Sequence, residues 1–151
     1  MLSSIFLFIC CISLASSFTL PPPTFLRSST SLSASLTLPV GIDANTRLTC
    51  PLDASSAETL GTEINELIGR FKLIKSNAAD GKPPSKQEPL EYTATVDGVT
   101  LKFECNPNIF PDPFKAEVFI TIKSPTIEIA SPALLPKLIE SVKAFKAANP
   151  V

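Results

Sequence analysis

The sequence predicts an α+β fold, a two-layer domain in which a four-stranded antiparallel sheet of two hairpins packs against two helices. Three observations predict it. The alternating runs Leu90–Val96 and Val99–Cys105 flank Asp97-Gly98, which is a strong signal for a hairpin turn. Two further β-rich segments follow, over Lys115–Lys123 and Thr126–Ala130. Amphipathic helical patterns precede the first hairpin and follow the second.

The first 42 residues differ in composition from the rest of the chain. They contain one charged residue, Arg27, whereas residues 43–151 carry 12 basic and 14 acidic side chains. The apolar run Ile5–Ala15 is too short to span a bilayer, which needs about 20 residues, and has the length of a signal-peptide core. We therefore expect a signal peptide over 1–17, a transit-peptide-like disordered segment over 18–42, and a single α+β domain over 43–151. A buried N-terminal helix is the alternative for the apolar run.

A short motif follows the apolar run. Ala15-Ser16-Ser17 supplies small residues for cleavage, Phe18 comes next, and the segment after it is rich in Ser and Thr and has no acidic residue. This order resembles the bipartite presequence of plastid-targeted proteins in diatom-like algae with secondary plastids, where a Phe directly after the cleavage site marks plastid import. The resemblance covers about 40 residues, none of them in the following domain. One departure is the absence of a positively charged side chain before the apolar run.

The resemblance implies passage through the endoplasmic reticulum and import into a plastid. No second apolar targeting run of sufficient length follows, because Ala34–Ile42 is short and is interrupted by Pro39 and Gly41. We therefore expect the stroma or the stromal face of the thylakoid. The thylakoid lumen, or plain secretion with a Ser/Thr-rich segment open to glycosylation, is the alternative.

Ser55–Lys75 has the strongest helical pattern in the chain. Ser55 and Glu58 have the spacing of a capping box, in which each side chain satisfies a free backbone N–H. The apolar stripe, which we interpret as core in preference to a partner-binding seam, consists of Leu60, Ile64, Leu67, Ile68, Phe71 and Ile74. A short extended segment is expected before the helix, at Arg47–Cys50. The polar Asn77–Pro89 segment after it is interpreted as a solvated connector, with a mobile interaction loop as the alternative.

The Asp97-Gly98 turn predicts the register of the first hairpin. It pairs Val96 with Val99 at the turn and Leu90 with Cys105 at the far end, and it places the apolar side chains on one face. A slip of one residue would expose all of them to water.

The second hairpin and the last helix are expected to follow directly. Pairing Lys123 with Thr126 would place Ile127 and Ile129 on the inner face. Ser131-Pro132 then predicts a helix cap with a first-turn proline, and a regular apolar stripe follows from Pro136 to the stop at Asn149-Pro150.

The segment Asn106–Phe114 is the best candidate for a partner-contact surface. Its three prolines exclude helix and central strand, yet Ile109, Phe110 and Phe114 are large and apolar. Such a loop either tucks these side chains under the sheet or presents them to a partner at low entropic cost. The sequence leaves both possibilities open.

No residue pattern indicates a catalytic, cofactor-binding or metal site. The chain has no His, which excludes His-based general base catalysis and metal sites that need imidazole. Glu91 and Glu104 are expected to lie opposite each other on the solvent face, a poor setting for acid–base chemistry. Cys50 and Cys105 are a possible redox pair, although buried free thiols are favoured because a stroma is reducing.

These observations favour a non-enzymatic role. The leading expectation is a peripheral subunit, or an assembly or stabilising factor, of a plastid photosynthetic complex, a photosystem in preference to other complexes. Its expected partner is a protein complex at the thylakoid surface. The near-neutral charge of residues 43–151 offers no case for binding nucleic acid, and we expect no membrane-spanning segment in this part. A small soluble lipid or pigment carrier and a secreted non-enzymatic protein are the alternatives.

Overall fold

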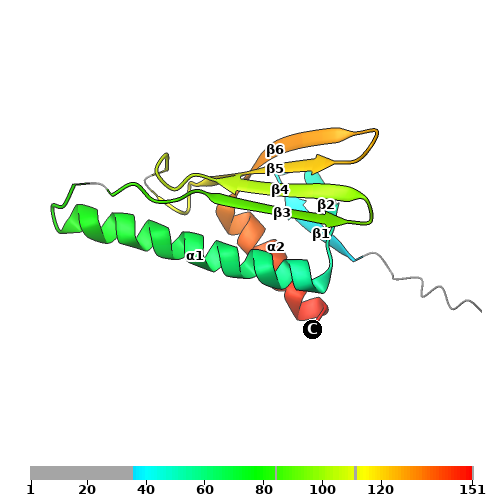
Figure 1. Cartoon of the computed structure of the whole chain (residues 1–151), viewed down its shortest axis with the longest axis horizontal. Helices are drawn as coiled ribbons and strands as arrows, with labels where there is room; N and C mark the ends of the chain where they lie inside the picture. Colours follow the sequence, from blue (N-terminus) through cyan, green and yellow to red (C-terminus); the bar gives the residue numbers. More distant parts are fainter. Residues whose placement is uncertain (1–35, 84, 111, 151) are drawn as a thin grey trace, which may run out of the picture. The chain divides into compact units, whose positions relative to one another are not determined.

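A computed structural model of the chain describes residues 36–83, 85–110 and 112–150, so the predicted signal peptide and most of the predicted transit-peptide-like segment lie outside the described residues. The described residues form a mixed α+β domain (Figure 1), as the sequence predicts. Its elements in chain order are β1 (Thr37–Gly41), β2 (Arg47–Pro51), α1 (Ala54–Ala79), β3 (Leu90–Val96), β4 (Val99–Cys105), β5 (Glu117–Lys123), β6 (Glu128–Leu134) and α2 (Leu135–Ala148).

The main sheet is antiparallel and has the strand order β3-β4-β5-β6. The predicted register of the first hairpin is confirmed at every position, from Leu90 opposite Cys105 to Val96 opposite Val99. Asp97 and Gly98 both have positive φ, 51° and 76°, which is the backbone that a type I′ turn requires.

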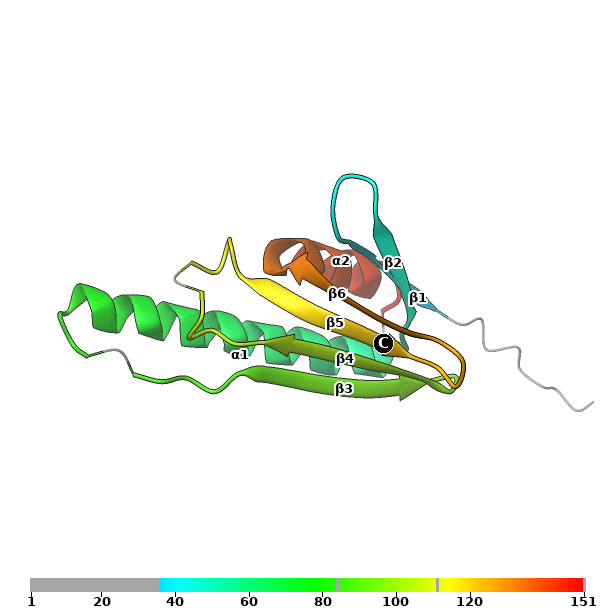
Figure 2. The same cartoon turned by 90° about the horizontal axis from the view of Figure 1, so that it is seen from above.

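Both helices lie on the same face of this sheet (Figures 1 and 2). The helix α1 contacts β3, whereas α2 contacts β5, β6 and also β1. Between the layers lies one cluster of buried side chains, of which the largest that are fully buried are Phe103, Leu38, Leu52, Leu60, Leu67, Leu90, Leu101, Ile120, Leu135, Leu138, Val40 and Val118. This cluster occupies the space in which the carrier hypothesis would place an apolar ligand.

A second, two-stranded sheet corrects the expected domain boundary. The segment 18–42 was expected to precede the fold, but β1 lies within it and pairs antiparallel with β2, with Leu38 opposite Cys50. Leu38 and Val40 alternate with exposed neighbours and are fully buried, so they belong to the core. Lys137 of α2 donates a hydrogen bond to the carbonyl oxygen of Ile42 (3.2 Å) and ties this hairpin to the helix. The folded domain therefore begins before residue 43.

The start of α1 also differs from the prediction. The N-cap is Asp53, whose carboxylate accepts hydrogen bonds from the Ser56 amide (2.7 Å) and from both hydroxyls of Ser55 and Ser56. Ser55 lies inside the helix and is not its cap, because the aspartate two positions earlier already satisfies the free amide. At the other end the helix continues to Ala79, beyond the expected end at Lys75.

The prediction for β6 is wrong in its bounds and register. Lys123 pairs with Glu128 and not with Thr126, because Ser124–Ile127 forms a four-residue turn closed by a hydrogen bond from the Ser124 amide to the Ile127 carbonyl (2.8 Å). Ile127 therefore lies in the turn and is 60% exposed, and Ile129, opposite Ile122, is 44% exposed.

Ser131-Pro132 belongs to the strand β6 and does not cap a helix. A proline is tolerated here because β6 is an edge strand, which needs the amides of only alternate residues for pairing. The last helix starts at Leu135 with Pro136 in its first turn, where a missing N–H costs no hydrogen bond.

Candidate functional site

The connection between β4 and β5 contains two turns of the same design. In each, an Asn or Asp precedes a proline, at Asn106-Pro107 and at Asp112-Pro113. Backbone hydrogen bonds close the turns, from the Ile109 amide to the Asn106 carbonyl (3.3 Å) and from the Lys115 amide to the Asp112 carbonyl (3.0 Å). Asx residues in the first position and proline in the second are the residues that such turns favour.

The side chains of the two Asx residues strengthen these turns. The Asn106 Oδ1 accepts a hydrogen bond from the Asn108 amide (3.0 Å), and the Asp112 Oδ1 accepts one from the Phe114 amide (3.0 Å). Each is an Asx turn superimposed on a backbone turn. The loop is therefore restrained on both sides of residue 111.

Asn108 fastens this loop to the connector that precedes β3. Its Oδ1 accepts a hydrogen bond from the Gln87 amide (2.8 Å), and its Nδ2 donates one to the Gln87 carbonyl (2.7 Å). Arg70 of α1 donates to the carbonyl oxygens of Glu88 and Pro89 and holds the same connector to the helix. Three segments distant in sequence thus form one structural unit at this end of the domain.

The three predicted contact residues, Ile109, Phe110 and Phe114, are called the loop surface below. Ile109 is 69% exposed and Phe114 is 76% exposed, the two largest values among the exposed large apolar side chains. Phe110 is partly buried and packs against the hydrophobic core. Phe110 thus anchors the loop to the core, whereas Ile109 and Phe114 point to solvent.

Two hollows adjoin the loop surface, and Phe110 lines both. The first, of about 400 Å³, is lined by Ile74, Ser85, Lys86, Pro107, Asn108, Ile109 and Phe110. The second, of about 360 Å³, is lined by Pro89, Leu90, Glu91, Glu104, Cys105, Asn106, Phe110, Glu117, Phe119 and Pro132. The surroundings of the loop are therefore concave on two sides and mixed in polarity.

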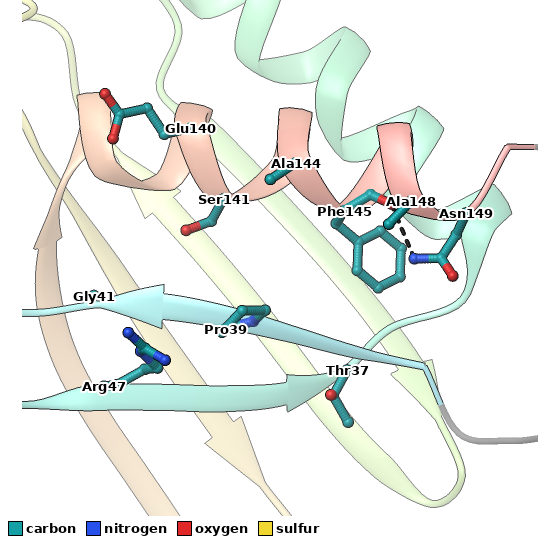
Figure 3. A pocket seen from close by; sticks show the side chains of 10 residues that line it. All are labelled: Thr37, Pro39, Gly41, Arg47, Glu140, Ser141, Ala144, Phe145, Ala148 and Asn149. Atoms are coloured by element: carbon teal, nitrogen blue, oxygen red, sulfur yellow. Dashed lines mark hydrogen bonds between the residues drawn. The ribbon is translucent and has the colours of Figure 1, made fainter.

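A larger hollow of about 500 Å³ lies elsewhere, between the β1–β2 hairpin and α2 (Figure 3). It is lined by Thr37, Pro39, Gly41, Arg47, Glu140, Ser141, Ala144, Phe145, Ala148 and Asn149. The strand residues that line it alternate with the buried Leu38 and Val40, so the hollow lies on the side of β1 away from the core. Its lining consists of small and polar side chains and two side chains of opposite charge, and this combination indicates no particular ligand or reaction.

Cys50 and Cys105 are free, buried thiols. Burial raises the pKa of each thiol to about 11, which disfavours the reactive thiolate. Cys50 lies in β2 of the two-stranded sheet, whereas Cys105 is the last residue of β4 in the main sheet. No disulfide joins the possible redox pair.

The carboxylates on the outer sheet face have simple electrostatics. Glu91 and Glu104 are directly opposite each other, as expected. Glu104 accepts a hydrogen bond from Lys102 (2.8 Å), and this bond raises the pKa of the lysine. Within the described residues, no three side chains of the Cys, Asp or Glu type are grouped so that they could hold a metal ion. No described helix combines the length and the hydropathy that crossing a membrane requires.

Sequence reasoning identified the loop surface but missed what holds it in place. The Asn108–Gln87 pair joins residues far apart in the sequence, so no local pattern announces it, whereas the repeated Asx-Pro dipeptide was a usable signal for two turns. Comparisons with family models, with curated proteins and with solved structures found no match for this chain.

Proposed function

We propose that the chain is a non-catalytic peripheral subunit, or an assembly or stabilising factor, of a plastid photosynthetic complex, with a photosystem as the first candidate. It binds this complex through the loop surface. The plastid address rests on the resemblance of the first 40 residues to a bipartite presequence. The binding role rests on the loop.

The observation that carries the proposal is the exposure of Ile109 and Phe114 on a restrained loop. Large apolar side chains cost free energy in water, and a partner that covers them recovers about 25 cal/mol per Å² of apolar area. The Asx-Pro turns and the Asn108–Gln87 pair fix the loop before binding. Less conformational entropy is therefore lost on association than for a flexible loop.

The test is blue-native electrophoresis of detergent-solubilised thylakoids, with mass spectrometry to locate the chain. The wild-type chain is expected in a band of photosystem size. Replacing Ile109 and Phe114 together by Ser should move it to the low-mass fraction. The structure predicts little loss of stability for this variant, because both side chains are mostly exposed.

A matched control is Ile127→Ser, which removes an apolar side chain of similar exposure from the β5–β6 turn. This variant should stay in the complex. A wild-type chain found wholly as a soluble monomer would contradict the proposed function. Equal retention of the double variant and the wild type would show that the loop surface is not the contact.

A further inference from the structure

The strand β3 has a free edge. It is the first strand of the sheet and pairs only with β4 within the described part of the chain. Figure 2 shows β3 as the outermost element along one side of the domain, with α1 lying beneath the sheet and not beside this edge. Among the described residues, the backbone groups on this side of β3 therefore have no strand partner.

The turn determines which residues present these groups. In a two-residue hairpin the residues that flank the turn, Val96 and Val99, exchange both backbone hydrogen bonds, and the pattern alternates from there. Thr95 and Thr100 are then a non-hydrogen-bonded pair, in agreement with the 3.3 Å contact between their hydroxyl oxygens. The N–H and C=O groups of Glu91, Thr93 and Thr95 thus point away from β4.

The two edge strands of the sheet differ in how they resist further pairing. Natural proteins protect edges with proline, lysine or short strands. The edge strand β6 contains Pro132, whereas β3 has seven residues, no proline, no lysine and one charge, Glu91. The hydroxyl of Tyr92 donates a hydrogen bond to the Ser56 carbonyl (2.9 Å), which fastens β3 to α1. This hydrogen bond and the pairing with β4 fix the strand β3 in an extended conformation that can pair with a further strand.

We propose that β3 pairs with β3 of a second copy of this chain, antiparallel and centred on Thr93. The two sheets then join into one sheet of eight strands about a two-fold axis, an isologous interface. The argument for this occupant is self-complementarity. With Thr93 opposite Thr93 of the second copy, Glu91 lies opposite Thr95, and all outward-pointing groups of both strands form hydrogen bonds.

Other registers are worse for physical reasons. A shift that places Glu91 opposite Glu91 of the second copy brings two carboxylates together and leaves one hydrogen-bonded pair. Intermediate shifts leave one outward-pointing residue of each strand unpaired or opposite the turn. In the centred register the half-buried inner residues also meet, with Tyr92 opposite Ala94. No like charges are then directly opposite.

Cysteine cross-linking tests the register in the full chain. In the centred register the two Thr93 Cα atoms are about 5.5 Å apart, within the range that a disulfide bridges. In the same register the Thr95 residues of the two copies are offset by four residues along the paired strands. Their Cα atoms are therefore roughly 13 Å apart, which no disulfide spans. Mild oxidation should therefore yield a covalent dimer with Thr93→Cys and not with Thr95→Cys. Because both variants keep the natural cysteines, only their difference reports the pairing.

Charge exchange tests the two-fold axis without covalent chemistry. Thr93→Lys and Thr93→Glu each place like charges opposite each other, so sedimentation velocity should show self-association weakened at least tenfold for either variant alone. An equimolar mixture of the two should recover the dimer. Thr121→Lys, on the outer face of the central strand β5, is the matched control and should associate like the wild type.

Two results would overturn the proposal. One is that the wild-type chain is monomeric at all concentrations and that the Thr93→Cys variant yields no covalent dimer. This outcome would be expected if β3 binds a strand of another protein or none. The other is equal cross-linking of Thr93→Cys and Thr95→Cys, which would exclude the centred register. Neither result bears on the loop surface, so failure of this inference is distinguishable from failure of the proposed function.

Discussion

Leu38→Ala tests whether β1 belongs to the fold. Leu38 is fully buried and lies opposite Cys50, so its truncation removes core contacts and leaves a cavity. Buried Leu→Ala changes cost about 2–5 kcal/mol, and full burial places this one near 3 kcal/mol. A domain of this size has a free energy of unfolding of about 6–17 kcal/mol, at 0.05–0.15 kcal/mol per residue. The variant should therefore fold, with a measurable loss of stability.

The assay is urea unfolding of the full chain followed by circular dichroism. With a denaturant slope of about 1–3 kcal/mol per M, the loss lowers the unfolding midpoint by roughly 1–3 M. Thr37→Ala is the control, because Thr37 is the exposed neighbour on the same strand and its truncation should change stability by less than about 0.5 kcal/mol. Equal midpoints for the two variants would refute the assignment of β1 to the core and restore a domain boundary near residue 43.

Three further predictions concern a helix cap, the thiols and a turn. Asp53→Ala should lower the free energy of unfolding by about 1 kcal/mol in the same assay. Hydrogen bonds from Ser55 and Ser56 hold the pKa of Asp53 below its usual value. The wild type should therefore have a higher free energy of unfolding than Asp53→Asn above about pH 4, and this difference should vanish as the pH falls through the lowered pKa. Cys50 and Cys105, with pKa values of about 11, should resist alkylation at pH 8 until urea unfolds the chain, which peptide mass spectrometry measures. Rapid labelling of either thiol in the native state would contradict their burial. Gly98→Ala should destabilise by about 1 kcal/mol, because φ is 76° there; an unchanged urea midpoint would argue against the type I′ turn.

The first hairpin could be predicted in full because local chemistry determines it. Asp97-Gly98 supports positive φ at both central positions, and the two-residue periodicity of the side chains then fixes which residues pair. The second hairpin lacked such a signal. Pro125 excludes the primed two-residue turns, and the hydrogen bonds of Ser124 that close the longer turn were not readable from the pattern.

The strand β1 could not be predicted because its own residues argue against it. Pro39 and Gly41 lower its strand propensity, and the charge step at residue 43 suggested a boundary there. Tertiary contacts override both, since Leu38 and Val40 complete the core. One local signal was present, the side chain of Asp43, which accepts hydrogen bonds from the amides of residues 45 and 46 and turns the chain between the strands.

The residues of the candidate site could be selected from the sequence, but which of them are buried and which are exposed could not. Ile109, Phe110 and Phe114 stood out as large apolar side chains among prolines. Whether each is buried depends on what packs beneath the loop, and that is the core and the connector at Gln87, both distant in sequence. The free edge of β3 likewise depends on strand order, which a list of strands does not contain.

The two proposed surfaces have a joint consequence that can be measured. Leu90 pairs with Cys105, so the loop surface follows β4 at the end of the sheet where β3 begins. In the centred register this end lies opposite Val96 of the second copy, and a dimer therefore carries its two loop surfaces at opposite ends of the shared interface. A two-site particle gains avidity on a surface with many partner copies, by up to 10²–10⁴ when the geometry allows both sites to bind. Thr93→Lys should accordingly lower the apparent affinity for membranes dense in the partner complex and leave the affinity for one isolated complex unchanged. Equal losses in both measurements would mean that residue 93 contacts the partner directly, and the edge of β3 would then be part of the binding site.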